Sequence, residues 1–343
     1  MEIGELRTGE EGAWDSYVYE SDASMFYHQI GWRNVVLKTY GHKPRYLVAR
    51  GDDGGIVGVL PMFLMESRVF GRKLVSVPFA PYGGVCADDA GVGRALVEAG
   101  ERVAREAGVD YFEIRSFENS DFRNCVTNDD YLTFIIDLGQ GVEYVWKNMR
   151  KDKKKGVKKA KKSNLGVEWN GGSVDGFYDV YTKNMRDLGT PVHSYNFFQN
   201  ILLEFPKNVK ILNIKHGDVV ICSKFLLNYK ESVISMWGST LGKYRKYHPY
   251  DLANWEAMVE SHAEGRRYFD FGRCLKNSGV FEYKMGWRGE QKPLFYQFYL
   301  AGGGNPPDFT QTNPKREMFA RVWRKLPLSV TRVVGHTMRR NFP

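Results

Sequence analysis

The sequence predicts a two-domain α/β protein with mixed sheets, and three observations lead to this prediction. The chain has 343 residues, enough for two domains of roughly 150 residues each. Hydrophobic residues make up 43% of it and aromatic residues 14%, which is typical of globular domains with sizeable cores. The order helix, strand hairpin, helix, strand occurs twice, and a turn at residues 139–141 separates the two occurrences.

The elements expected in the first half follow from periodicity and turn residues. The GDDGG turn supplies the positive φ angles that a strand hairpin needs, and residues 91–108 have the apolar spacing of an amphipathic helix that ends at Gly108. The expected elements are a helix at 31–41, strands at 45–50 and 56–66, a helix at 91–108, and strands at 111–117 and 131–138.

The second half repeats this order after a basic helix. The run at 210–239 alternates strand-forming segments with short turns, which predicts three successive antiparallel strands. The expected elements are the basic helix within 147–162, a helix at 174–189, these three strands, a helix at 251–265 that ends at Gly265, and a strand at 267–273.

Positive charge is concentrated in two segments of a chain whose formal net charge is +9. Residues 147–162 hold ten Lys or Arg and one Asp, and residues 311–343 hold eight Lys or Arg and one Glu. The rest of the chain is therefore acidic. This pattern favours a polyanionic partner: phosphates, nucleic acid or an anionic membrane surface. A solvated helix face and a solubilising tail are the alternative reading.

The remaining composition excludes several classes of protein. The acidic start has no apolar secretory segment, and no run of about 18 apolar residues predicts a membrane span, so we expect a cytoplasmic protein. The cysteines are far apart and form no CxxC pair, so we expect reduced thiols and no zinc site. These are Cys86, Cys125, Cys222 and Cys274.

Motifs of nucleophilic, metal-dependent and nucleotide-dependent enzymes are absent. The sequence has no GxSxG elbow, no HExxH and no P-loop, and its glycine stretches lack the strand-to-helix setting of a dinucleotide fingerprint. What remains is direct attack of an amine on an activated acyl group, without a covalent intermediate. Such a reaction needs a stabiliser for the oxyanion, a sink for the amine proton and grips for two substrates.

Residues 268–290 carry the most specific motif: a strand that ends in DFGR at 270–273, a short loop, and YKMGW at 283–287. This pattern resembles the motif that closes the second domain of the Fem-type aminoacyltransferases, peptidoglycan bridge-forming enzymes built from two GNAT (N-acetyltransferase-like) domains. The segments FYHQIGWRNVVLKTYG, KKKGVKKAKKSNLGVEW and YRKYHPYDLANWEAMVESHAEG resemble further parts of the family in the same order. The DFGR spelling, the SG before the lysine and the WRKLPL tail are most similar to FemAB-related proteins of exosortase and surface-polysaccharide systems.

The resemblance implies two tandem GNAT-like domains, at 1–140 and 141–310, followed by a basic amphipathic tail at 311–343. It implies an N-acyltransferase that passes an aminoacyl group from aminoacyl-tRNA, or another activated acyl group, to an amine of a phosphorylated or lipid-linked cell-envelope precursor. No cofactor is expected, and acyl-CoA is the alternative donor. The implied location is the cytoplasm, at the inner face of the membrane if the acceptor is lipid-linked.

Two rival functions stay open at this stage. An acyl-CoA-dependent GNAT N-acetyltransferase would show a Q/RxxGxG/A pyrophosphate loop, which neither domain shows clearly. A non-catalytic nucleic-acid-binding protein would use residues 147–162, but these have little of the aromatic interleaving that base stacking needs.

The resemblance implies that Lys284 lines the acyl-transfer site and stabilises the oxyanion or the departing ribose oxygen. A surface lysine stacked between aromatic rings is the alternative reading. Asp270 is a candidate base, with a structural carboxylate as the alternative. Lys154 occupies the place of a family arginine and lacks the bidentate fork, which Arg150 can supply. The candidate substrate-binding residues are Arg150, Lys154, Lys38, Trp32, Tyr244, Arg245, Arg273 and Tyr283; Trp32 and Lys38 are expected to face a cleft, and Ser278 and Gly279 to set the loop geometry.

The tail predicts one amphipathic helix that ends at Pro327. Its apolar residues fall on a single helical stripe, flanked by Lys315, Arg316, Arg324 and Lys325. The stripe either docks on the protein's own domain, or it lies in the inner membrane leaflet with Trp323 at the headgroups and the basic side chains against anionic lipid. Its members are Met318, Phe319, Val322, Trp323 and Leu326.

Overall fold

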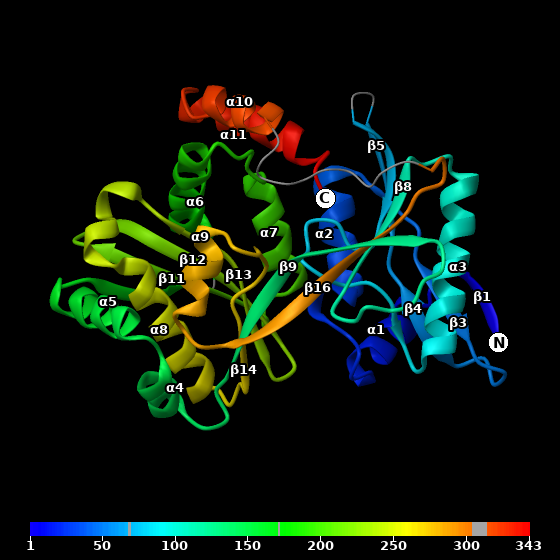
Figure 1. Cartoon of the computed structure of the whole chain (residues 1–343), viewed down its shortest axis with the longest axis horizontal. Helices are drawn as coiled ribbons and strands as arrows, with labels where there is room; N and C mark the ends of the chain where they lie inside the picture. The colour runs from blue at the N-terminus through cyan, green and yellow to red at the C-terminus, as the bar shows by residue number, and fades with distance from the viewer. Residues whose placement is uncertain (68–69, 171, 304–313) are drawn as a thin grey trace. The chain divides into compact units, whose positions relative to one another are not determined.

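The computed structural model describes residues 1–67, 70–170, 172–303 and 314–343. The chain divides into two compact units (Figure 1). Unit 1 comprises Met1–Tyr131, Pro293–Phe309 and Arg340–Pro343, and unit 2 comprises Leu132–Lys292 and Thr310–Arg339. The expected start of the tail at 311 and the side chains of residues 314–316 lie outside the described structure.

Unit 1 contains two sheets. Their hydrogen-bonded orders are β1–β3–β4–β7 and β16–β8–β6–β5–β2, and the strands β9 (Cys125–Asp137) and β16 (Glu290–Tyr299) have residues in both units. The other elements are β1 (Glu2–Glu5), α1 (Glu11–Glu20), η1 (Phe26–His28), α2 (Ile30–Tyr40), β2 (Lys43–Pro44), β3 (Leu47–Arg50), β4 (Ile56–Leu60), β5 (Phe63–Ser67), β6 (Gly71–Val75), β7 (Cys86–Ala87), α3 (Ala90–Glu106) and β8 (Tyr111–Ser116).

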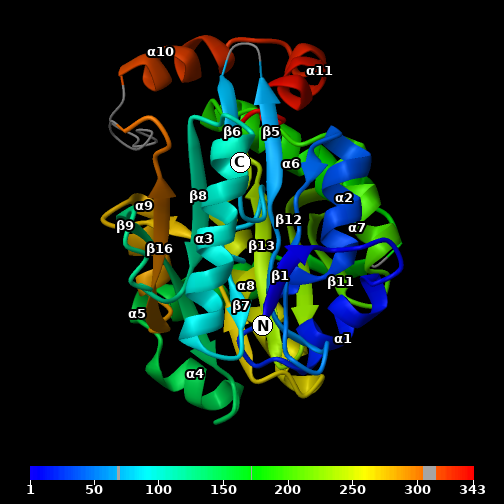
Figure 2. The same cartoon turned by 90° about the vertical axis from the view of Figure 1, so that its right-hand side faces the viewer.

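Helix α3 covers the strands of unit 1 (Figure 2). Asp89 begins the helix by accepting hydrogen bonds from the backbone N–H groups of Gly91 and Val92. Its apolar face packs on buried residues of β3, β4, β5, β6 and β8, as the sequence predicts. The expected single strand at 56–66 is divided into β4 and β5 around Pro61, which has no N–H to donate to a ladder.

Unit 2 contains a mixed sheet with the order β10–β11–β12–β13–β14–β9. The three strands expected within 210–239 are present, whereas α7 and α11 were not anticipated. The elements are α4 (Val142–Asn148), α5 (Lys151–Lys162), β10 (Gly166–Asn170), α6 (Asp175–Leu188), α7 (Tyr195–Glu204), β11 (Val209–His216), β12 (Val219–Tyr229), β13 (Ser232–Thr240), η2 (Gly242–Tyr247), α8 (Pro249–Ala263), β14 (Tyr268–Asp270), β15 (Cys274–Leu275), α9 (Gly279–Met285), α10 (Pro314–Trp323) and α11 (Leu328–Arg339).

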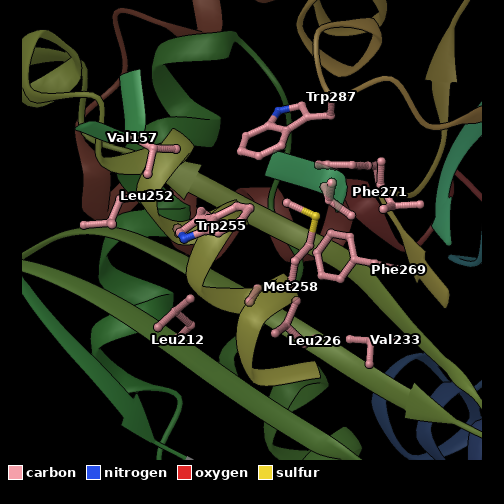
Figure 3. Close-up of a cluster of buried hydrophobic side chains, with 14 of the residues drawn as sticks. Val157, Leu212, Leu226, Val233, Leu252, Trp255, Met258, Phe269, Phe271 and Trp287 are labelled. Carbon is pink, nitrogen blue, oxygen red and sulfur yellow. The ribbon is translucent and has the colours of Figure 1, made fainter. Parts of the chain in front are cut away.

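The core of unit 2 anchors both ends of the motif at 268–290. Side chains from α8, β11, β12 and β13 form one buried cluster with Phe269, Phe271 and Trp287 (Figure 3). The Phe271 and Trp287 ring centroids lie 5.8 Å apart. The segment between them, which includes Lys284, is therefore attached to the core at both ends, and this restricts its conformations.

The two units repeat the same strand pairing, which confirms the predicted duplication. In unit 1, β6 pairs in parallel with β8, and the third pair of the register is Val75 with Glu113. In unit 2, β13 pairs in parallel with β14, and the third pair is Ile234 with Asp270. The sequence YFE in β8 thus occupies the register of YFD in β14, so an acidic residue stands at the same position in each unit.

The C-terminal helices differ from the single stripe expected from the sequence. A second helix, α11, follows α10 after Pro327. Trp323 is buried within unit 2, whereas Met318 and Val322 are exposed. The expected stripe is therefore divided between two sides of α10. Within the described ranges, no helix is both long enough and apolar enough to cross a membrane.

Candidate functional site

The candidate site lies where β13 and β14 diverge. Their parallel register ends at Ile234 and Asp270, and β13 continues to Thr240 while the chain after Asp270 turns away. Gly272 forms that turn with a φ of +72°, a conformation that favours glycine. A Cβ atom there would lie 3.2 Å from the Ser235 carbonyl oxygen, so the turn and β13 are in close contact.

Lys284 lies on α9, a short helix that the sequence did not predict and that follows the expected short loop. Ser278 caps this helix, because its hydroxyl accepts a hydrogen bond from the Phe281 N–H. This explains the role of the SG pair before the lysine. The capped helix directs Lys284 back toward the turn at Gly272.

The Lys284 ammonium is buried, with 7% of the residue exposed. Its Nζ atom donates to the Gly272 carbonyl at 2.6 Å and to the Arg273 carbonyl at 3.2 Å. An ammonium has three N–H bonds, and the third finds no further acceptor within the described part of the chain. Burial lowers the pKa of Lys284, against the opposing effect of the Cys274 thiol and the Asp270 carboxylate.

The surface-lysine reading of Lys284 is therefore wrong. The lysine that lies over the Tyr283 ring is Lys153, at 3.8 Å from its centroid. Lys284 instead presents a fixed, partly desolvated cation at the point where the strands separate. Such a cation suits stabilisation of a developing negative charge.

Asp270 organises the turn beside this lysine. It is 4% exposed, and its Oδ1 atom accepts hydrogen bonds from the Gly272 N–H at 2.7 Å and from the Thr133 hydroxyl. These bonds hold the turn that presents the Gly272 carbonyl to Lys284. The observed contacts match the structural alternative for Asp270.

Lys224 is a second buried lysine at this place, and sequence reasoning missed it. It is 0% exposed in the middle of β12, and its Nζ atom donates to the Ser235 hydroxyl at 2.6 Å. The ammonium also lies 4.6 Å from the Tyr250 ring centroid. Within the described residues no carboxylate forms an ion pair with it. Burial, together with the Lys284 charge, lowers the pKa of Lys224 to about 7, against the opposing effect of Cys222.

A buried polar cluster joins the basic helix α5 to α9. The Asp251 carboxylate accepts a hydrogen bond from the Tyr283 hydroxyl at 2.7 Å and lies 3.5 Å from the Lys153 Nζ atom. Asn254 donates to the same Tyr283 hydroxyl at 2.9 Å. Burial, with the Asp251 carboxylate, raises the pKa of Tyr283 well above its ordinary value. In this structure Tyr283 holds α9 on α8.

The remaining candidates in unit 2 surround this cluster. The Arg150 side chain is partly exposed and forms a 3.0 Å ion pair with Asp152. The backbone N–H of Arg150 donates to the Gly286 carbonyl. Lys154 donates to the Lys147 carbonyl. Tyr244 and the exposed Arg245 lie on η2, which packs against α5 and α8, and Arg273 is exposed beside Lys284. The structure thus brings Arg273, Asp270 and Lys284 together directly. Arg150 is connected to the same segment by the hydrogen bond from its backbone N–H to the Gly286 carbonyl.

The two candidates in unit 1 have different surroundings. Lys38 is exposed on α2. Trp32 is fully buried, and its indole N–H donates to the Pro78 carbonyl at 3.3 Å. The expectation that Trp32 faces a cleft is therefore wrong, because neighbouring aromatic rings of unit 1 enclose it.

In unit 1 the position that corresponds to the Asp270 turn is occupied by an arginine side chain. Glu113 forms a 2.7 Å ion pair with Arg115, and both side chains are buried. Arg115 also donates to the Ala80 carbonyl. In unit 2 a glycine stands two residues after the acidic residue, where unit 1 has this arginine. Lys284 therefore has room at the strand divergence of unit 2.

Both helices that follow a strand hairpin have a carboxylate at or near their N-terminus. In α3 the Asp89 carboxylate occupies the N–H groups of Gly91 and Val92, and acidic residues line a cavity of about 650 Å³ beside it. In α8 the first residue is Pro249, which has no N–H, and Asp251 is in the first turn. A helix N-terminus binds phosphate through unpaired N–H groups and positive potential, and the carboxylate at each of these two ends reduces that potential.

Comparison with known proteins places the chain among structures of one fold. Residues 147–285 match the family model described as "Acetyltransferase (GNAT) domain". The solved structure of FemX superposes with a TM-score of 0.66 at 12% identity, over 88% of this chain and 97% of FemX. The fold is that of tandem GNAT proteins. No curated protein matches the sequence.

Two further solved structures share the tandem GNAT fold. L-PGS from Bacillus licheniformis superposes with a TM-score of 0.58 at 12% identity, over 95% of this chain and 100% of that one. A tandem GNAT protein from the clavulanic acid biosynthesis pathway gives 0.58 at 10% identity, over 89% and 99%. These similarities support two GNAT-like units and leave the substrates to be inferred from the site.

Proposed function

We propose that the protein is an N-acyltransferase that moves an aminoacyl group from aminoacyl-tRNA to an amine of a phosphorylated cell-envelope precursor. The observation that carries this proposal is the buried Lys284, which is held by two carbonyls and has one N–H left for a ligand. It lies in the unit whose residues match the GNAT model. The similarity to the FemX and L-PGS structures supports the aminoacyl donor.

The reaction is a direct displacement at an ester. The neutral amine of the acceptor attacks the ester carbonyl carbon, a C–N bond forms, and negative charge develops on the carbonyl oxygen. The bond to the ribose oxygen then breaks, and this oxygen takes up one proton while the attacking amine gives one up, so that an amide and a free hydroxyl remain. Lys284 donates its third N–H to the developing oxyanion or to the departing ribose oxygen.

The amine proton must leave during this step, and we assign Lys224 as its sink. Because its pKa is lowered to about 7, a large fraction of the Lys224 side chain is the neutral amine near neutral pH. Its partner Ser235 is the residue whose carbonyl lies close to Gly272. The Ser235 hydroxyl thus links Lys224 to the strand divergence where Lys284 lies.

The basic side of α5 is our candidate for the acceptor's phosphate. Most of its lysines are exposed, including Lys151, Lys155 and Lys159, and Arg150 stands at its start next to the Gly286 carbonyl. A guanidinium with nearby ammonium groups binds phosphate well. A lipid-linked acceptor would place the protein at the inner face of the membrane.

An acyl-CoA donor is the second candidate, favoured by the description of the matched model. The experiment that decides is to incubate the protein separately with charged tRNA pools and with acyl-CoA, each with envelope precursors that carry a free amine. Precursor-dependent loss of the tRNA ester supports the proposal. Loss of acyl-CoA alone contradicts it and identifies an ordinary N-acetyltransferase.

A further inference from the structure

The two C-terminal helices turn apolar side chains toward solvent. On α11, Val330, Val333 and Val334 have the i, i+3, i+4 spacing of one helical stripe, and all three are exposed, Val333 by 73%. On α10, Met318 and Val322 lie one turn apart and are 65% and 59% exposed. A helix that docks on its own protein in water usually buries such a stripe.

The opposite side of α11 is small and polar, and it is the side that packs on unit 2. Thr331 is completely buried, and a Cβ atom on Gly335 would lie 2.9 Å from a Val192 side-chain carbon. Arg332 donates to Asp179 at 3.1 Å and to Thr182 at 3.0 Å. Figure 1 shows α11 beside α6, which supplies both of these partners.

Helix α10 is fixed in the same way. Trp323 is 2% exposed and packs near Gly335 of α11. Ala320 packs so closely on Gly189 that a Cβ atom there would lie 2.6 Å from the Ala320 Cβ. With these contacts on the inner side, neither helix can rotate its exposed apolar side chains inward without losing them.

Positive charge accompanies the exposed apolar side chains. Arg321, Arg324 and Lys325 are exposed on and just after α10, within a segment that holds eight Lys or Arg and a single Glu. Exposed valines flanked by cations fit the interfacial region of a bilayer with anionic lipids, where the apolar groups enter between headgroups and the cations meet their phosphates. Self-association of this cationic surface would bring like charges together.

We propose that α10 and α11 form a docking surface for an anionic membrane, with Val333, Val334, Met318 and Val322 as the inserting side chains. This assignment differs from the sequence expectation, which placed Trp323 at the headgroups. It rests on the exposure and charge of these helices alone, so it holds or fails independently of the acyl donor and acceptor.

The test is co-sedimentation of the full chain with vesicles of phosphatidylcholine, with and without phosphatidylglycerol. We expect binding only to the anionic vesicles, weakened at least tenfold by high salt. Val333→Asp and, separately, Val322→Asp should each weaken this binding at least tenfold, because a carboxylate opposes both insertion and the lipid charge. Both side chains are exposed, so circular dichroism should show an unchanged fold.

Leu203→Asp is the matched control, since Leu203 is 74% exposed on α7 of the same unit. It should bind anionic vesicles as the unmodified chain does. Equal binding to neutral vesicles, or equal loss in the Leu203 and Val333 variants, overturns the proposal. So does a molar mass by light scattering that falls from dimer to monomer in Val333→Asp, because the stripe would then serve a second copy of the chain.

Discussion

The Lys284 Nζ atom and the Gly272 carbonyl oxygen are joined by a 2.6 Å hydrogen bond. Gly272 can offer this carbonyl because its own N–H is held by Asp270 and its φ of +72° turns the chain away from β13. The DFG and YKMGW segments of the motif thus meet through one contact. The first prediction removes the donor of this hydrogen bond, and the second strains the turn that presents its acceptor.

Replacing Lys284 with Met should lower the transfer rate by about 10²- to 10³-fold, the cost of removing one donor to an oxyanion. Met keeps the length and apolar stem of the side chain, so the fold should persist. The rate is measured as amide product formed under saturating donor. Lys207→Met, at an exposed position of the same unit, is the control, and equal rates in the two variants would remove Lys284 from the reaction.

Replacing Gly272 with Ala should destabilise the protein more than the same change at Gly217. Both glycines have positive φ, which costs an alanine about 1–2 kcal/mol. Only at Gly272 does the added Cβ also meet a backbone atom, the Ser235 oxygen at 3.2 Å, whereas Gly217 has nothing within 4 Å. The free energy of unfolding in urea measures the difference, and equal losses would show that the close contact is relieved without cost.

The sequence predicted the duplicated fold because apolar periodicity and turn residues are local signals. It also placed Asp270 and Lys284 in one motif, since both lie within a short segment. It did not predict that Lys284 is buried, because burial depends on Phe271 and Trp287 reaching the core of unit 2. Lys224 had a usable signal: a lone lysine inside the apolar run 219–229, which predicts a charge in a strand buried on both faces.

The C-terminal helices show a different limit. The spacing in 318–326 predicted an amphipathic helix, and α10 is present. Which side of α10 is buried depends on its contacts with Gly189 and with α11. Gly189 is distant from the stripe in sequence, and the sequence did not predict α11 as a helix. Small residues such as Ala320 and Gly335 define the packed side, and hydrophobicity alone gives them little weight.

Replacing Tyr283 with Phe should destabilise the protein by about 1–3 kcal/mol, because the buried Asp251 carboxylate loses a donor and Asn254 loses an acceptor. The KM for the acceptor should change little if Tyr283 holds α9 on α8. Urea unfolding and steady-state kinetics measure the two effects. Tyr19→Phe, at a 70% exposed position, controls for loss of a hydroxyl, and a raised KM with unchanged stability would make Tyr283 a substrate-binding residue.

Lys224 should give the transfer reaction a dependence on pH. Its pKa in the folded protein is lowered to about 7, and only the neutral amine can accept a proton. The rate at saturating substrates should therefore rise with pH through about 7 and level off above it. In Lys224→Met the rate should be low and without this inflection. A variant that keeps both the rate and the inflection would exclude Lys224 as the proton sink.

The same group links protein stability to pH. In the unfolded chain Lys224 keeps its proton up to its ordinary pKa of 10.5, whereas in the folded protein it loses the proton near pH 7. Between these pH values the unfolded state therefore binds more protons than the folded state. The free energy of unfolding consequently rises with pH, by at most about 1.4 kcal/mol per pH unit. Below pH 7 the burial cost is constant and at its largest. Lys224→Met should therefore unfold at higher urea than the unmodified chain at pH 7, and the gap should narrow as the pH approaches 10. A gap that does not change with pH would show that Lys224 stays protonated in the folded state and cannot serve as the proton sink.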